Sequence, residues 1–420
     1  MIKSERLKIW FLIAVLSICG TASFASCASN DGNATEQSEI TAIADKVWAF
    51  SQTHPDGFTI NIRTMTEPTE GIAVSYAATQ NSYSCVPSVA SELSSSVRDQ
   101  LDKVVSHALQ HEGYVGGWLN REDGLYYFDS TKLFPENELQ GAIQFGKENG
   151  QYSIFILSTY TDIPVEGKVA EILERGTILF GTTGDYRPLS FCEPDGTYWG
   201  FGIEVANEIA KRLGVSIEFR KTSWPTLTAD VQAEPQTFDL AIGGITITDT
   251  RKETMLMSEG YLANGKTILC RASEADRYKS LTDIDKPEVT VMVNPGGLNE
   301  KFANENLTHA NIVVHQKNEE IPTLVAEGAA DVMITEITEA PYYVKTDTRL
   351  AAPLLNAPFT HGEIGILMQK GQEDLLTLVN AVIATMKVDG TLRQLHEKYG
   401  LTYAYYHEEK PVYVVPSFRK

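Results

Sequence analysis

The chain has 420 residues, and its 35 lysines and arginines against 55 aspartates and glutamates give a formal net charge of −20. This length predicts roughly two or three domains, and hydrophobic residues make up 43% of the sequence, which is enough to form their cores and excludes a disordered protein. The acidic balance excludes the broad basic surface that nucleic-acid binding requires. If this protein binds an anion, it must do so through local donors.

Residues 1–27 have the features of an export signal. A basic start precedes an apolar run from Ile9 to Ile18 that is too short to span a bilayer. Small residues follow, and Phe-Ala-Ser-Cys at 24–27 resembles a lipobox. Two interpretations stay open, namely lipid attachment at Cys27, which we favour, and simple cleavage near Ala25. Either one predicts an exported protein, periplasmic or held at the cell surface by a lipid anchor.

Residues 28–165 predict a small α+β domain whose role the sequence does not indicate. Residues 31–38 read as a polar tether, and 160–167 as a linker to the next domain. Apolar residues at three- and four-residue steps predict helices at 40–48, 93–109 and 138–148. Alternating patterns predict a hairpin over 114–128 and strands at 58–62, 72–76 and 152–157, the first two of them paired.

His107 and His111 lie four residues apart, which would place both on one helix face, a spacing that can bind a metal. No third ligand stands at a matching distance, so we interpret them as solvated or locally bonded histidines and predict no metal. The three cysteines after the leader fit no metal or redox motif, and their pairing stays open: Cys85, Cys192 and Cys270.

Strand and helix patterns alternate through residues 166–402, and 403–420 form a tail. Helices are predicted at 169–175, 203–213, 298–307 and 390–399, and strands at 177–183, 216–221, 238–242 and 289–293. This alternation predicts an α/β fold with a mostly parallel sheet and sites at the carboxyl ends of strands.

The stretch from Val289 to Phe302 predicts an anion site. Alternating valines form a buried strand, Asn-Pro-Gly-Gly at 294–297 turns the chain, and Leu298 opens a helix. A helix N-terminus presents free backbone N–H groups and the positive end of the helix dipole. Alone, such a turn is usually an ordinary connection between a strand and a helix.

Several motifs follow one another in the C-terminal region. They are Thr-Thr-Gly-Asp-Tyr at 182–186, Thr-Ser-Trp-Pro at 222–225, Gly-Gly-Ile-Thr-Ile-Thr at 243–248 with Arg251, and Gly-Lys-Thr at 265–267. This series resembles the bacterial extracellular solute-binding proteins of the polar amino-acid class. The string from Val293 to Ala303, with His315 and Glu339, is similar to the cyclohexadienyl dehydratases, which are enzymes built on that fold.

The resemblance covers residues 168–400 and implies a two-lobed, type II periplasmic binding protein-like domain. One lobe would comprise 168–266 with the chain from 362, and the other 268–360. The hinge crossings would lie near 266–270 and 358–362.

The implied activity is decarboxylative dehydration of prephenate or arogenate, without a cofactor. The ring carboxylate leaves as CO2 and the hydroxyl as water, so the reaction needs one acid and firm anion binding. The alternative is a non-catalytic binding protein for an amino acid or a related carboxylate that delivers it to the permease of an ABC transporter.

Arg251 is expected to hold a carboxylate through its planar guanidinium. Glu339 is the expected general acid, on the same helical stretch as Glu336, where two neighbouring carboxylates raise at least one pKa. Lys266 matches the enzyme motif, and the alternative is a lysine at the hinge surface. The other expected ligand contacts are Tyr186, Trp224, Thr246, Gly297, Asn299 and Glu336.

Three positions depart from the pattern of the family. Leu298 replaces a threonine and removes a hydroxyl from the anion site. Glu336 replaces the aspartate with which amino-acid binders hold the ligand ammonium, and Gly202 stands where aspartate is usual. These departures weaken the substrate assignment more than the fold.

Overall fold

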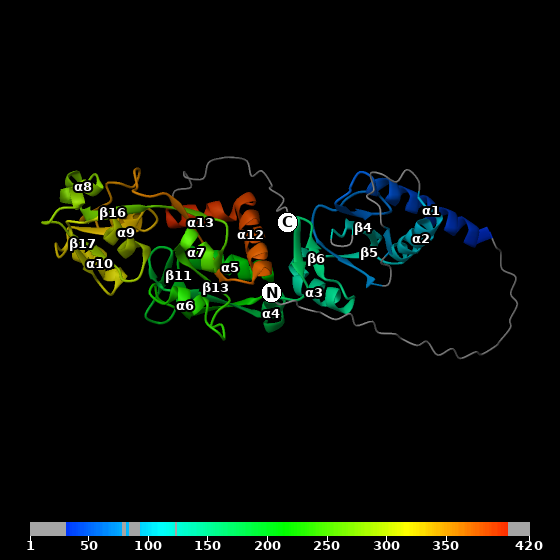
Figure 1. The fold of residues 1–420 in the computed structure, drawn as a ribbon, viewed down its shortest axis with the longest axis horizontal. Helices are drawn as coiled ribbons and strands as arrows, with labels where there is room; N and C mark the ends of the chain where they lie inside the picture. Colours follow the sequence, from blue (N-terminus) through cyan, green and yellow to red (C-terminus); the bar gives the residue numbers. More distant parts are fainter. Residues whose placement is uncertain (1–30, 78–80, 84–92, 122–123, 402–420) are drawn as a thin grey trace, which may run out of the picture.

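The computed structural model describes residues 31–77, 81–83, 93–121 and 124–401 (Figure 1). An N-terminal domain, a first lobe and a second lobe follow one another along the long axis of the molecule. The leader with Cys27, the segment with Cys85 and the tail from 403 lie outside the described residues.

Seven strands form the sheet of the N-terminal domain, in the order β1-β4-β5-β2-β6-β7 with β3 beside β5. The helices that pack with it are α1 Asp31–Ser51, α2 Ser95–Gln110 and α3 Leu139–Glu148. The strands are β1 Gly57–Asn61, β2 Ile72–Ser75, β3 Asn81–Tyr83, β4 Tyr114–Leu119, β5 Tyr126–Phe134, β6 Ser153–Ile156 and β7 Thr161–Pro164. The hairpin expected over 114–128 is present as β4 and β5, and α2, α3 and β6 are confirmed within two residues.

Three expectations for this domain are wrong. The strand β1 pairs with β4 and not with β2, because Gly117 leaves room opposite β1 for the ring of Phe58, which a Cβ there would approach to 2.5 Å. Residues 31–38 continue α1 instead of forming a tether, and Gln37 bonds to Asp102 of α2 at 3.0 Å. The expected linker contains β7, which completes the sheet.

The N-terminal domain and the first lobe share one apolar core. A single cluster of buried residues runs from Ile72 and Ile163 in the sheet to Val169 in α4 (Lys168–Arg175) and Leu378 in α12 (Glu373–Val388). An ion pair between Lys147 and Glu174 adds a polar contact at this boundary. We propose residue 165 as the domain boundary, because β7 ends the sheet and α4 opens the first lobe.

The first lobe is built on a six-stranded sheet, with strand order β12-β8-β13-β21-β14 and β15 beside β21. The strands are β8 Thr177–Thr182, β12 Ser216–Lys221, β13 Leu240–Thr246, β14 Met255–Met257, β15 Leu262–Asn264 and β21 Gly362–Gln369. A small separate sheet joins β9 Asp185–Tyr186, β10 Ser190–Cys192 and β11 Tyr198–Trp199. The remaining helices of this lobe are α5 Phe201–Leu213, α6 Leu227–Val231, α7 Asp249–Thr254 and α13 Thr391–Tyr399.

The second lobe has a five-stranded sheet in the order β18-β17-β19-β16-β20. Its strands are β16 Lys266–Arg271, β17 Thr290–Val293, β18 Asn311–Val314, β19 Val332–Glu336 and β20 Leu350–Ala351, and its helices are α8 Leu281–Ile284, α9 Leu298–Asn306, α10 Ile321–Ala326 and α11 Ala340–Thr346. Both lobe sheets are mixed and not mostly parallel as expected, because β16 and β21, the strands next to the hinge crossings, run antiparallel to their neighbours.

The two hinge crossings touch at Gly265. The first crossing is this residue alone, between β15 and β16, so all of β16 belongs to the second lobe. The second crossing ends at β21, and the Lys266 backbone N–H donates to Thr360 Oγ1 at 2.9 Å. A Cβ on Gly265 would lie 2.1 Å from the Thr360 carbonyl oxygen, so glycine is required at this close approach.

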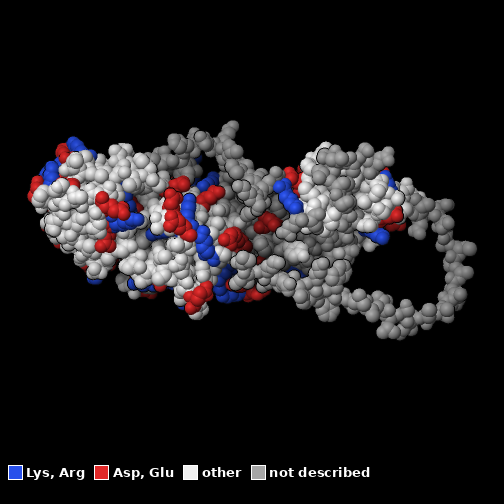
Figure 2. All heavy atoms as spheres, viewed as in Figure 1, with Lys and Arg blue, Asp and Glu red and all other residues white. Residues whose placement is uncertain are grey.

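Figure 2 shows acidic and basic side chains interspersed on the visible face of the two lobes. Among the described residues no single helix is long and apolar enough to span a membrane, and only α12 with α13, bent by 76°, meets the criterion as a pair.

We expect Gly265→Ala to destabilise the protein by about 1–3 kcal/mol, the usual scale for overpacking. The added methyl group would push the backbone of one crossing away from the other. The control is Gly362→Ala in the second crossing, where a Cβ would meet only Thr246 Cγ2 at 3.6 Å. Calorimetry of both variants checks this prediction, and equal melting temperatures would contradict it.

Candidate functional site

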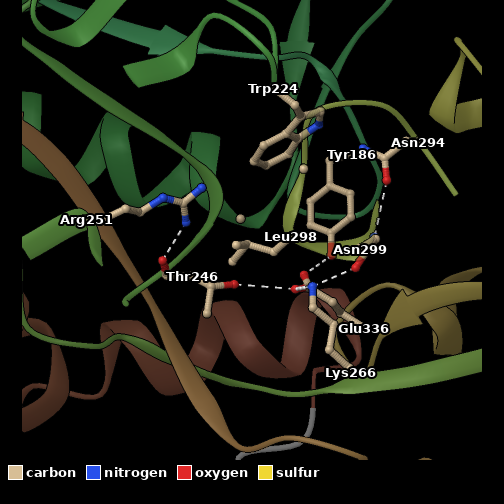
Figure 3. A pocket seen from close by; sticks show the side chains of 11 residues that line it. Tyr186, Trp224, Thr246, Arg251, Lys266, Asn294, Leu298, Asn299 and Glu336 are labelled. Atoms are coloured by element: carbon tan, nitrogen blue, oxygen red, sulfur yellow. Dashed lines mark hydrogen bonds and ion pairs between the residues drawn. The ribbon is translucent and has the colours of Figure 1, made fainter. Parts of the chain in front are cut away.

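A cavity between the two lobes brings together eight of the nine residues expected to contact a ligand (Figure 3). Those from the first lobe are Tyr186, Trp224, Thr246 and Arg251, and those from the second lobe and the hinge are Lys266, Gly297, Asn299 and Glu336. The strands β9, β13 and β19 each end at one of them, which places the cavity at the carboxyl edges of the sheets.

Lys266 and Glu336 form a buried ion pair in this cavity. They are direct partners in the register of β16 and β19, so their side chains leave the sheet on the same face. Lys266 Nζ lies 2.5 Å from Glu336 Oε1 and 2.6 Å from Asn299 Oδ1, and its residue is 7% exposed. The alternative of a lysine at the hinge surface is therefore wrong.

The first lobe also donates hydrogen bonds to Glu336. The Tyr186 hydroxyl bonds to Oε2, and Thr246 Oγ1 lies 3.4 Å from Oε1. Burial opposes ionisation of this carboxyl, but Lys266 and the hydrogen bonds outweigh burial and hold its pKa below the usual value. The same burial and the nearby Glu336 raise the pKa of Tyr186 well above its usual value, so the phenol stays protonated and donates.

Arg251 lies at the other side of the cavity, in the short helix α7. Its Nη1 donates to the Thr246 carbonyl oxygen at 2.6 Å, and its backbone N–H donates to Thr248 Oγ1, which caps the helix. No carboxylate of the described chain lies within 4.0 Å of the guanidinium. Burial lowers the pKa of this guanidinium, so an anionic ligand would relieve an unfavourable desolvation.

The turn after β17 lies at the cavity. Gly297 is the N-cap of α9, without a side-chain cap, and it lines the cavity together with Leu298, so the N-terminal end of this helix borders the cavity. Asn299 donates to Asn294 Oδ1 at 3.3 Å while its own oxygen accepts from Lys266. Arg251, Lys266 and Glu336 sum to one positive charge, to which the helix end adds a partial charge.

Glu339 does not line the cavity. The segment after Glu336 is not helical, because Val332–Glu336 forms the central strand β19 and α11 begins only at Ala340. Glu339 is fully buried behind this strand end, with Oε2 accepting from Thr335 Oγ1 at 2.5 Å and Oε1 from Asn318 Nδ2 at 3.2 Å. Burial, with the negative charge of Glu336 added, raises the pKa of Glu339 to about 8.

The lobes are in direct contact around this site. The side chain of Asn318 in the second lobe donates to the Asp185 carbonyl oxygen in the first lobe at 3.2 Å. Within the first lobe, Trp224 Nε1 donates to the Asp185 carboxylate at 3.1 Å. The ring of Trp224 stands edge-on to Tyr186, with centroids 5.7 Å apart. The free volume of the cavity is about 20 Å3, which holds one water molecule, so a ligand requires the lobes to open.

Sequence reasoning missed Asn318 because no local pattern marks it. Asp185 and Gly244 lie inside motifs named above, but nothing in the sequence assigned either residue a role at the site. A Cβ on Gly244 would lie 2.4 Å from the Tyr186 ring, so this glycine makes room for the tyrosine. Gly202 is packed against Gly243, with 3.3 Å from a built Cβ to its Cα, and the aspartate usual in the family would not fit without rearrangement.

The remaining candidates lie elsewhere or carry no chemistry. His107 Nδ1 bonds to Ser130 Oγ at 2.9 Å and His111 Nδ1 to the His107 carbonyl oxygen at 2.8 Å, as the local-bonding interpretation predicts. Within the described ranges no group of three or more potential ligands could hold a metal ion. Cys192 and Cys270 are free thiols.

The two-lobed region is similar to several known proteins. The cyclohexadienyl dehydratase of Pseudomonas aeruginosa is 37% identical over 232 residues, 55% of this chain and 85% of that protein. The L-cystine-binding protein TcyJ of Escherichia coli is 31% identical over 235 residues, 56% of this chain and 86% of its own length. The crystal structure of the ancestral amino acid-binding protein AncCDT-1, described as a precursor of cyclohexadienyl dehydratase, matches with a TM-score of 0.51 at 38% identity and covers 55% of this chain and 98% of that one.

The type II two-lobed fold expected from the sequence is confirmed by these structural neighbours. Membership of an extracellular family agrees with the export expected from the leader. The model of the bacterial extracellular solute-binding proteins, family 3, matches residues 178–402, more than half of the sequence, and the chain belongs to that family.

Proposed function

We propose that this protein is an exported enzyme that converts prephenate or arogenate to phenylpyruvate or phenylalanine by decarboxylative dehydration. The observation that carries the proposal is the ion pair of Lys266 with Glu336 inside the cavity. The ammonium of Lys266 occupies the place beside Glu336 that the ammonium of an amino-acid ligand would take. The cavity therefore has an excess of positive charge, from Arg251, Lys266 and the start of α9, and this charge favours an anionic ligand.

We assign the proton transfer to Glu336, because this carboxyl faces the cavity and Glu339 does not. Without a ligand, Lys266 keeps Glu336 ionised. A dianionic substrate would draw Lys266 toward its own carboxylate and bring negative charge close to Glu336, and both changes raise the pKa of Glu336. The acid can then take up a proton before the lobes close.

The bond changes balance without a cofactor. Glu336 transfers its proton to the substrate hydroxyl, and the C–O bond breaks to release water. The bond from the ring to its carboxylate breaks to release CO2, and its electron pair completes the aromatic ring. Tyr186 stabilises the carboxylate that Glu336 becomes, and solvent restores the proton once the lobes reopen.

The second candidate is a non-catalytic binding protein for an amino acid or a related carboxylate, working with an ABC transporter. Leu298 favours it, since the hydroxyl that the family has at this anion site is missing. The relatives that support it include an L-cystine-binding protein and, at 26% identity, an ABC transporter glutamine-binding protein of Bacillus subtilis. In that case Lys266 would leave Glu336 free for the ligand ammonium.

We expect the mature protein to convert prephenate to phenylpyruvate, and the absorbance of phenylpyruvate measures this reaction. Glu336→Gln should lower turnover by about two orders of magnitude or more, the usual contribution of general acid catalysis, whereas Glu339→Gln should retain most of it. A greater loss in Glu339→Gln would restore Glu339 as the acid. If the wild type binds prephenate without converting it, the enzyme hypothesis is wrong and the non-catalytic binding protein remains.

Arg251→Ala should weaken binding of prephenate by roughly 2–5 kcal/mol, the scale for truncating one partner of a buried charge pair. Arg251→Lys keeps the charge but loses the planar fork, so a substantial loss should remain. Calorimetric titration measures both effects. Wild-type affinity in Arg251→Ala would show that the carboxylate is held elsewhere.

The raised pKa of Glu339 predicts a dependence of stability on pH. The folded state holds this proton more tightly than the unfolded state, so the contribution to stability is complete below pH 4.5 and is lost as the pH rises toward about 8. Glu339→Gln should flatten the fall in melting temperature between about pH 5 and 8. An identical pH profile in wild type and variant would contradict the pKa assigned to this carboxyl.

A further inference from the structure

A second cavity lies between the lobes and shares no lining residue with the cavity around Glu336. Its volume is about 350 Å3, which is within the range of small-molecule sites and far larger than the 20 Å3 around Glu336. Arg187, between β9 and β10, contributes from the first lobe. The rest of the lining comes from the second lobe, chiefly Glu319, Tyr342 and Tyr343.

Two opposite charges face this cavity without an ion-pair partner. The Arg187 guanidinium stacks on the Phe191 ring, 3.2 Å from its centroid, and no carboxylate in the described part of the chain lies within 4.0 Å of its nitrogens. Glu319 is half-buried and likewise has no cation within 4.0 Å among the described residues. The third charge of the lining, Asp347, is already paired with Arg349.

The aromatic wall carries a further polar group. Tyr343 is 6% exposed, and its buried hydroxyl lies beside the Glu339 carboxyl, so the tyrosine offers this cavity mainly its ring. Tyr342 reaches the first lobe, with its ring centroid 6.3 Å from that of Trp199, so the cavity closes only when the lobes close.

We propose that this cavity binds a zwitterionic α-amino acid with an aromatic side chain. Its carboxylate pairs with Arg187, its ammonium pairs with Glu319, and its side chain packs against Tyr342 and Tyr343. A simple anion would leave Glu319 unpaired and a simple cation would leave Arg187 unpaired, whereas a zwitterion satisfies both. Because the two charges belong to different lobes, the ligand would hold the lobes closed. This site goes beyond the proposed dehydratase and requires no turnover.

The test is calorimetric titration of the full-length mature protein with L-phenylalanine. Arg187→Gln and Glu319→Gln should each weaken one binding event by about tenfold or more, since each removes one partner of an ion pair. Arg251→Ala, in the other cavity, should leave that event unchanged. The matched probes 3-phenylpropionate, which lacks the ammonium, and 2-phenylethylamine, which lacks the carboxylate, should bind at least about tenfold more weakly for the same reason.

Three results would overturn the proposal. They are absence of binding to the wild type, loss of every binding event in Arg251→Ala with none weakened in Arg187→Gln, and equal affinity for 3-phenylpropionate. If Arg187→Gln does not fold by circular dichroism, Glu319→Gln and Arg187→Lys decide the outcome in its place. None of these measurements uses prephenate, so failure of the dehydratase assignment and failure of this site can be told apart.

Discussion

The structure of the site depends on the ion pair between Lys266 and Glu336. Two charges buried to this extent, 7% and 4% exposed, are tolerated only because each finds the other, and removing one partner of such a pair typically costs about 3–5 kcal/mol. Lys266 is the first residue after the hinge crossing at Gly265, and Tyr186 reaches Glu336 from the opposite lobe. The charge balance of the cavity and the closure of the lobes are therefore set by the same few atoms.

Glu336 and Glu339 lie three residues apart, but their pKa values are shifted in opposite directions because their surroundings differ. Glu336 ends a strand whose neighbour supplies a lysine, so its charge is compensated and its pKa falls. Glu339 lies one turn further along, behind the sheet, where it meets only neutral donors and the charge of its neighbour, so its pKa rises. Two carboxyl groups only three residues apart therefore differ in charge near neutral pH, with Glu336 ionised and Glu339 protonated. Acid–base sites commonly hold two carboxyl groups with pKa values shifted in opposite directions.

Local sequence patterns predict helices, strands and motifs, but not contacts between distant segments. The resemblance of the ordered motifs to a known family named eight residues that the structure brings together in one cavity. The direction of Glu339 could not be predicted in the same way, because a spacing of three from Glu336 indicates one face only in a helix, whereas β-branched residues extend β19 to Glu336. The pairing of β1 with β4 and the presence of Arg187 and Glu319 in one cavity both involve segments more than fifty residues apart, so neither is visible in local sequence.

The apolar core that joins the N-terminal domain to the first lobe has a consequence for how the protein could be divided. A chain that began at residue 166 would leave Val169 and the β7-facing side of α12 without the surface that now covers them. Water would then meet an apolar patch on an otherwise acidic protein, and such patches drive self-association. Residues 31–165 thus shield an apolar face of the first lobe, and we expect the lobe without them to self-associate.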